Sequence, residues 1–329
     1  MSPLAHTKPA RRRDSVLKYC LLVVAVLLSI TSASAQSSDR GIWRLEYNDS
    51  RDRVTLVFED YDVEGRHHGN TSYGVNLSEL QGLTPSQLTA GDSPVRFQLI
   101  RDAGTFSFDG RVRNGRGTGF YTFSPSAAFP QQMMSRGYER QSAEQQFLLA
   151  MHNVGFTFTD ELKRQGYPRP SVDDLVTMGM HGVSLEYLRG LSDLGYRLGS
   201  TDQLITLRDH GVTPNFIRGL ASAGHSNLDV RDLLELRDHG VTPDYIGALE
   251  SLGYSRLSAE QLLSARDHGV TADFAQSFRE MGYTNLSLRD LVRMRDHGVT
   301  PEFARRIRAV DGSLRPIDEL ISRRDRGDS

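Results

Sequence analysis

The phrase Arg-Asp-His-Gly-Val-Thr-Pro recurs in this chain with a period of 29 residues. It is complete where it begins at Arg208, Arg237 and Arg295, and the copy at Arg266 differs only in its last letter, which is Ala. Weaker copies lie one and two periods upstream, and a shortened copy ends the chain. A fixed period of this length is typical of arrays of small helical units that stack on one another. The repeats therefore constrain the architecture of most of the chain, but they indicate no reaction.

The N-terminal residues have the pattern of a secretory signal peptide. A basic segment at residues 11–13 and Lys18 precedes an unbroken apolar run over 21–28, and Ala33-Ser34-Ala35 matches the small-x-small cleavage pattern. We therefore predict that residues 1–35 are cleaved and that the mature protein is exported, either periplasmic or secreted. The alternative is an uncleaved inner-membrane anchor, although the run has about half of the roughly 20 residues that a stable span needs.

Cys20, the only cysteine, lies in the predicted signal peptide. The mature protein is then expected to have no disulfide, thiolate metal site or cysteine nucleophile. Loss of residues 1–35 also removes five basic residues and one acidic residue, which moves the formal net charge from -2 to -6. An acidic balance without a basic stripe argues against nucleic acid as a partner. No other apolar segment is long enough for a membrane span, so none is expected after signal cleavage.

Residues 37–124 alternate apolar and polar side chains with a period of two, which predicts half-buried strands. The clearest hairpin contains Asn114-Gly115, the preferred pair for a type I′ turn. Gly117 and Gly119 in its return strand predict a bulge or a close packing contact. We expect a small antiparallel sheet or sandwich of about five to seven strands. The apolar positions of the other strands are Trp43, Leu45, Tyr47, Val54, Leu56, Phe58, Val95, Phe97 and Leu99, and a short helix is expected to start at Thr84-Pro85.

The rest of the chain has a helical period, with two short helices in each repeat. In the best-formed copy, Ser287 and Asp290 form a variant of the capping box at the start of the first helix. Gly298 supplies the left-handed residue that ends this helix. Thr300 then caps the second helix, and Pro301 occupies its first turn, where no N–H is missed. Starts and stops of this kind recur in each copy.

Together these two regions predict an α+β chain. A small antiparallel β domain over residues 37–124 is followed by an α-solenoid-like array over residues 126–329. We expect about fourteen short helices through Asp325, at two per repeat. The terminal copies are less regular, as is typical of units with one solvated face.

The histidine of the phrase occurs once per repeat. Ligands of one zinc ion lie about 2 Å from it, whereas packed helices lie about 8–10 Å apart. Histidines of adjacent repeats are therefore poorly placed to share an ion, and we expect no metal site. Our interpretation is a donor near the helix C-terminus that satisfies the last carbonyl groups.

The arginine and aspartate of the phrase are the candidate binding residues. Adjacent residues of a helix do not face each other. We therefore expect an arginine of one repeat to meet an aspartate of the next, in a ladder that sets the register. The alternative is a row of guanidinium groups presented to an anionic ligand. The candidates are Arg208, Arg237, Arg266, Arg295, Asp209, Asp238, Asp267 and Asp296.

Catalytic signatures are absent from the sequence. There is no HExxH helix, GxSxG elbow or P-loop, so we expect neither an enzyme nor a cofactor. The nearest acid–base combination is Glu59 with Asp62 and His67, the last expected in a polar loop. Nothing in the spacing of these three residues requires a catalytic role.

The repeats resemble those of a bacterial envelope family of poorly known function, and the resemblance extends to the preceding string VRFQLIRDAGTFSFDGRVRNGRGTGFYTFSP. Similar repeats are found in the C-terminal regions of some antibiotic-sensor proteins that carry membrane-embedded metallopeptidase domains. The resemblance covers residues 93–329. This chain lacks the HExxH motif and the multiple membrane spans of that peptidase, so the resemblance implies no protease activity and no catalytic residue.

We therefore predict an exported scaffold that binds a protein or peptide partner in the cell envelope through its repeat surface, with envelope signalling as one setting. The alternative is a sensor or ligand-binding module for a small anion or glycan, without catalysis. The sequence does not indicate the oligomeric state.

Overall fold

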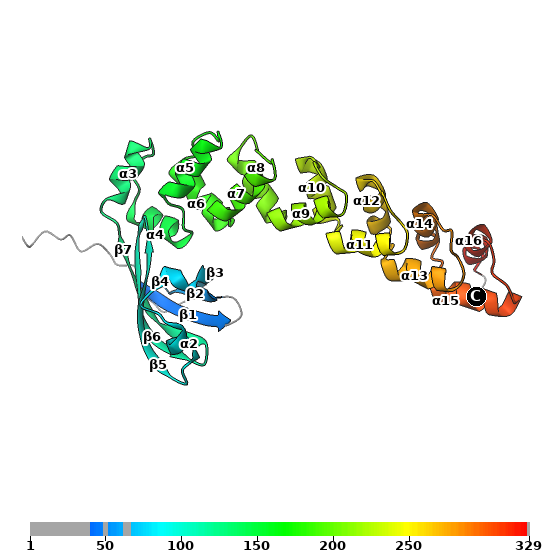
Figure 1. Cartoon of the computed structure of the whole chain (residues 1–329), viewed down its shortest axis with the longest axis horizontal. Helices are drawn as coiled ribbons and strands as arrows, with labels where there is room; N and C mark the ends of the chain where they lie inside the picture. The colour runs from blue at the N-terminus through cyan, green and yellow to red at the C-terminus, as the bar shows by residue number, and fades with distance from the viewer. Residues whose placement is uncertain (1–39, 49–51, 62–66, 328–329) are drawn as a thin grey trace, which may run out of the picture. The chain divides into compact units, whose positions relative to one another are not determined.

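The computed structural model describes residues 40–48, 52–61 and 67–327 and divides into two compact units (Figure 1). The first unit takes in Thr105–Ser124 and the described residues up to Ile100. The second comprises Arg101–Gly104 and everything from Pro125 onward. The predicted signal peptide lies outside the described residues. The structure confirms the predicted α+β fold, in which a β unit is followed by a helical array.

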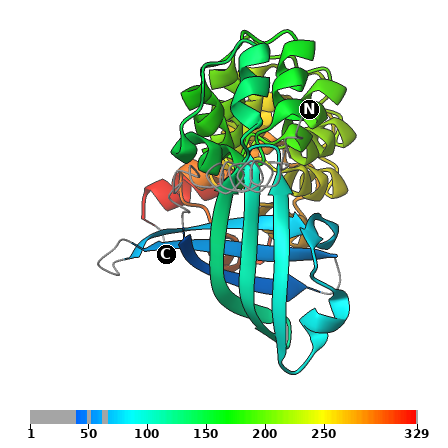
Figure 2. The ribbon, with the colours of Figure 1, turned by 90° about the vertical axis from the view of Figure 1, so that its left-hand side faces the viewer.

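The first unit is an antiparallel sheet that curls on itself, as Figure 2 shows. Its described residues form seven strands in the order β3-β2-β1-β7-β6-β5-β4. The count agrees with the upper end of the predicted range. The strands are β1 (Arg40–Asn48), β2 (Arg53–Tyr61), β3 (His67–Asn76), β4 (Leu80–Gln81), β5 (Ser93–Arg101), β6 (Gly104–Arg113) and β7 (Arg116–Pro125), with η2 (Leu77–Glu79) and α2 (Pro85–Thr89) between them.

Trp43 lies at the centre of this sheet in a slot made by glycines. Its side chain is fully buried, and its indole Nε1 donates to the carbonyl oxygen of Asp109 at 3.2 Å. A Cβ at Gly117 would lie 2.8 Å from the indole, and one at Gly119 would lie 2.1 Å from the Asp109 carbonyl. The pairing of β1 with β7 runs without a register shift. The predicted glycine contact is therefore close packing and not a bulge.

The β6–β7 hairpin has the predicted turn. Asn114 and Gly115 have φ angles of 48° and 80°, as a type I′ turn requires. The amide of Gly115 donates to the carbonyl of Leu88 at 2.7 Å, which ties the turn to α2. Helix α2 begins at the predicted cap, since Thr84 and Gln87 form a capping box.

Strand β3 was not expected from the sequence, and the prediction that His67 lies in a polar loop is wrong. The strand contains two glycines, and Tyr73 and Val75 are its clearest apolar residues, so its alternation is weak. It pairs with β2 from Arg53↔Asn76 to Tyr61↔His67, with an irregularity at Asp60/Tyr61. Pairing with a well-formed neighbour outweighs the low strand propensity of such a segment.

The described residues of the second unit form fourteen helices in series, the expected number, arranged in two rows (Figure 1). First helices of successive repeats contact one another, and so do second helices. First helices are α4 (Ala143–Met151), α6 (Val172–Met180), α8 (Thr201–Asp209), α10 (Val230–Asp238), α12 (Ala259–Asp267), α14 (Leu288–Asp296) and α16 (Ile317–Asp325). Second helices are α3 (Phe129–Ser135), α5 (Phe156–Arg164), α7 (Leu185–Asp193), α9 (Pro214–Ser222), α11 (Pro243–Ser251), α13 (Ala272–Glu280) and α15 (Pro301–Asp311).

The predicted helix ends are confirmed in the best-formed copy. Ser287 and Asp290 form a capping box at the start of α14, and Gly298 after its end has a φ of 66°. The amide of Val299 donates to the carbonyl of Met294 at 2.8 Å, which completes a Schellman motif. The buried valine thus connects the turn to the core. The same bond, also 2.8 Å long, joins Val212 to Leu207, Val241 to Leu236 and Val270 to Ala265.

We predict opposite effects of alanine at two glycines of one repeat. Gly240 has a φ of 70°, and an added Cβ would lie 3.5 Å from Arg266, so the strain would come from the backbone alone. Gly240→Ala should destabilise the array by about 1 kcal/mol. Gly247 lies within α11 with nothing within 4 Å of an added Cβ. Gly247→Ala should stabilise the array by about 0.5 kcal/mol.

Urea unfolding of the two variants and the wild type measures both effects. A midpoint of Gly240→Ala at or above that of the wild type would contradict the left-handed role of Gly240.

A candidate interaction surface on the repeat array

Each histidine of the phrase from His181 onward contacts the aspartate of the next repeat. The histidine is the C-cap of one first helix, and the aspartate is the last residue of the following first helix. Because a carboxylate only accepts hydrogen bonds, the ring Nδ1 carries the proton. Nδ1–Oδ1 distances are 2.8 Å for His181–Asp209, 2.7 Å for His210–Asp238 and 2.9 Å for His297–Asp325, and His239–Asp267 and His268–Asp296 pair likewise. We call these five pairs the His–Asp ladder.

The arginine of each phrase lies over the buried aromatic ring of the preceding second helix. Such a cation–π contact joins the two rows of helices across the repeat boundary. The arginine also reaches the preceding turn, since Arg208 Nε donates to the carbonyl of Gly182 at 3.1 Å and Arg295 Nε to that of Gly269 at 2.7 Å. Distances from Cζ to the ring centre are 5.5 Å for Arg208–Tyr187, 5.3 Å for Arg237–Phe216, 5.0 Å for Arg266–Tyr245 and 4.2 Å for Arg295–Phe274.

A ladder between repeats is therefore present, but the partner of each aspartate is histidine and not arginine. Consecutive residues of a helix point about 100° apart. The aspartate consequently faces the histidine of the preceding turn, while the arginine faces the aromatic ring of the preceding second helix. The glycine carbonyl of that turn accepts from the arginine and not from the histidine. Binding of a partner by these eight arginines and aspartates stays a prediction.

Two histidines show how the local partner sets the protonation state. The hydrogen bond and charge of Asp267 raise the pKa of His239, and Asp238 and Glu235 add to this effect. His152 has Met180 one repeat later in place of an aspartate. Burial lowers the pKa of His152 to about 4, against the opposing effect of its hydrogen bond to the backbone of Gly179. His152 is therefore neutral at pH 7.

A buried carboxylate in α5 was missed by the sequence analysis. Glu161 is only 6% exposed and accepts from Arg164 Nε at 3.0 Å and Gln165 Nε2 at 2.6 Å, with Arg189 Nε at 3.6 Å. The bond from Arg164 is the main cause that lowers the pKa of Glu161 to about 2. An alignment of the repeats singles out Glu161, because the equivalent residue is small in the four following repeats: Gly190, Gly219, Ala248 and Ser277.

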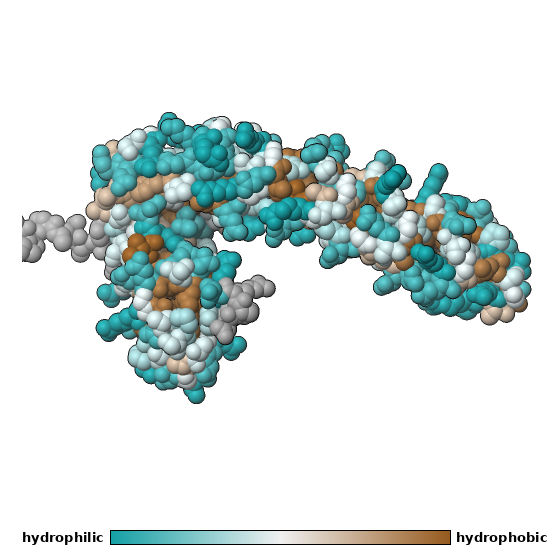
Figure 3. Space-filling view, viewed as in Figure 1, coloured by the Kyte–Doolittle hydropathy of each residue, from teal (hydrophilic) through white to brown (hydrophobic). Residues whose placement is uncertain are grey.

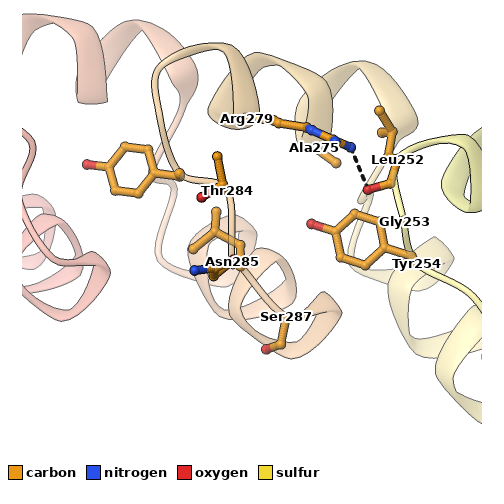
Figure 4. A pocket seen from close by; sticks show the side chains of 10 residues that line it. Leu252, Gly253, Tyr254, Ala275, Arg279, Thr284, Asn285 and Ser287 are labelled. Atoms are coloured by element: carbon orange, nitrogen blue, oxygen red, sulfur yellow. Dashed lines mark hydrogen bonds between the residues drawn. The ribbon is translucent and has the colours of Figure 1, made fainter.

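Two grooves open at the edge of the array where second helices end. The larger has a volume of about 460 Å³ and lies between the loops that follow α11 and α13. In Figure 4, Arg279 reaches the carbonyl of Leu252, a 2.8 Å hydrogen bond, and Tyr254 points toward the loop with Thr284 and Asn285. The smaller has a volume of about 310 Å³ and is lined by residues of α3, α5 and the loop after α5.

Of the acid–base combination considered in the β unit, the structure describes only the side chain of Glu59. Glu59 is buried and pairs with Arg44. Asp62 lies outside the described residues, and only the backbone of His67 is described. Within the described ranges, no group of three or more His, Cys, Asp or Glu side chains could hold a metal ion. No helix in the described part of the chain is long and apolar enough to span a bilayer.

Comparison with models of known protein families gave no match, and neither did comparison with curated proteins or with solved structures. The resemblance of the repeats to an envelope family therefore stays an expectation.

We predict that Asp267→Asn lowers the pKa of His239. The raised pKa in the folded state means that this pair stabilises the array fully below the pKa of unfolded histidine, about 6.5. That stabilisation is lost as the pH rises through the folded pKa of His239. NMR titration of the His239 ring in both proteins measures the shift. As a control, Asp244→Asn changes an exposed acid of α11 and should leave His239 unaffected. Identical titration of His239 in the wild type and Asp267→Asn would refute the pairing.

We also predict that Arg295→Lys destabilises the array by about 0.5–1 kcal/mol. Lysine keeps the charge but loses the planar group over Phe274 and the Nε donor to Gly269. Arg289→Lys, at an exposed position of the same helix, is the matched control. Urea unfolding should separate the two variants, and equal midpoints would show that the stacked guanidinium contributes nothing.

Proposed function

We propose that the protein is an exported scaffold that binds a protein or peptide partner in the cell envelope through the exposed faces of its second helices. Export is supported by the signal-peptide pattern of residues 1–35. The binding role is supported by how the array divides its residues between internal contacts and the surface.

One observation carries the proposal: the recurring Arg, Asp and His side chains contact neighbouring repeats, whereas the exposed residues of the second helices differ from copy to copy. The arginine, aspartate and histidine of the phrase contact neighbouring repeats, as the pair of Arg266 with Tyr245 and of Asp267 with His239 illustrates. Side chains that are engaged in contacts between repeats are poor candidates for recognising a partner. The proposed partner surface is therefore formed by residues outside the repeated phrase.

The outer stripe consists of three positions on each of the five second helices from α7 to α15, spaced i, i+3 and i+7 and so on one face. Charge and size at these positions change from helix to helix, which gives the array an ordered row of mostly polar side chains that differ between repeats. Such a row suits recognition of an extended polar partner. The outer stripe contains Glu186, Arg189, Asp193, Asn215, Arg218, Ser222, Asp244, Gly247, Ser251, Asp273, Gln276, Glu280, Glu302, Arg305 and Ala309.

The surface favours a polar interface over an apolar one. The face of the array seen in Figure 3 is mostly hydrophilic, with apolar side chains visible between helices. Exposed large apolar residues in the described array are scattered: Met134, Met180, Val310 and Leu314. Interfaces formed by polar surfaces of this kind are typically reversible and salt-dependent.

We predict that altering the outer stripe abolishes capture of an envelope partner. The variant combines Arg218→Glu, Asp244→Lys and Asp273→Lys, all exposed on second helices. The matched control combines Asp202→Lys, Glu260→Lys and Arg289→Glu, the same changes on exposed positions of first helices.

The full mature chain is immobilised and exposed to envelope extract, and captured proteins are quantified by mass spectrometry. A partner retained by the wild type and control but reduced at least about tenfold by the stripe variant supports the proposal; tenfold corresponds to about 1.4 kcal/mol. Equal capture by both variants would place the partner elsewhere, and no reproducible capture by the wild type would count against a scaffold.

A further inference from the structure

The two grooves at the ends of the second helices are the same groove in two different repeats. They are separated by 116 residues, which is four periods of the array. Each is bounded by the tyrosine that follows one second helix and by the tyrosine one repeat later. Each also has a basic residue on the second helix between them. The equivalent pairs are Tyr138 and Tyr254, Lys163 and Arg279, and Tyr167 and Tyr283.

Both grooves are lined by hydrogen-bond donors, with one basic side chain in the larger groove and three in the smaller. No carboxylate lines the larger groove, where Arg279 keeps further N–H groups beyond the one bonded to Leu252. In the smaller groove Lys163 and Arg169 accompany Arg136. The one carboxylate there, Asp160, accepts two bonds from Arg136, at 3.0 and 3.2 Å, and is neutralised by it.

The basic residue is not a general requirement of the repeat. The three central repeats have Ser192, Ala221 and Glu250 at this position. Their helices pack in the same two rows without a cation. Packing of the repeat therefore does not require a cation at this position, and the basic residues of the two grooves lie in a chain whose formal net charge is -2.

We propose that each groove binds one small anionic ligand, a carboxylated or phosphorylated compound of about the size of a sugar. The volumes of about 460 and 310 Å³ lie at the lower end of the roughly 300–1,000 Å³ of ligand pockets. The basic residue pairs with the anion, and the guanidinium of Arg279 matches the oxygens of a carboxylate or phosphate in a planar fork. The tyrosine rings present apolar faces to the body of the ligand.

This proposal concerns a different surface from the outer stripe and goes beyond a scaffold role. It is tested by calorimetric titration of the full mature chain with glucuronate, with glucose 6-phosphate and with glucose. The two charged probes distinguish a carboxylate from a phosphate ligand. We expect at least one of them to bind at two sites per chain, in a salt-dependent way, and glucose to give no measurable binding.

Single substitutions assign the sites. Arg279→Gln and Lys163→Gln should each remove one of the two sites. Arg308→Gln is the matched control, because Arg308 occupies the same repeat position and donates to the carbonyl of Met281 at 3.1 Å but lines neither groove. Arg308→Gln should retain both sites. Its thermal unfolding shows how much stability the array loses when only the carbonyl contact is removed. Thermal unfolding of each variant verifies that the array is folded.

Any of four results would overturn the proposal. Binding of glucose as strong as that of the charged probes would exclude anion recognition. Two intact sites in Arg279→Gln or Lys163→Gln would place the ligand elsewhere, as would loss of a site in Arg308→Gln. No binding of either charged probe would refute the proposal, while the outer-stripe capture experiment would still test the scaffold role independently.

Discussion

The array depends on the left-handed turn that ends each first helix. A glycine such as Gly240, with a φ of 70°, lets the chain reverse and bury the following valine. The next repeat then holds this turn from outside, with its arginine over the ring of the second helix and its aspartate on the histidine. One backbone conformation thus sets both the helix pair within a repeat and the register between repeats.

This arrangement explains why the terminal copies differ. His152 has no aspartate one repeat later, and it is correspondingly buried and neutral. Glu161 occupies a position that is small in the four following repeats, and it is accommodated because arginines and a glutamine surround it. Individual polar contacts therefore stabilise the first repeats, whereas the His–Asp ladder joins the regular repeats. The outer stripe takes no part in the His–Asp ladder, and its residues vary from helix to helix.

Much of the fold could be predicted because its signals are local. The cap at Ser287, the stop at Gly298 and the Asn114-Gly115 turn are set by backbone conformations that few residues adopt. Strand β3 could not be predicted, because its extended conformation depends on pairing with β2. The partners of the arginine and aspartate were assigned wrongly, since they depend on the angle at which one repeat meets the next. The grooves have residues from three segments, so their basic residues had no visible connection along the chain.

The sequence by itself determined the period, the helix boundaries, the hairpin turn and the division into a β region and a repeat array. Steric limits on φ, cap hydrogen bonds and apolar periodicity act within a few residues, so they can be recognised directly in the sequence. Only the tertiary structure decided that histidine faces aspartate, that arginine faces an aromatic ring and that tyrosines of successive loops flank a groove. These contacts join residues a repeat apart, and their geometry follows from how the helices stack.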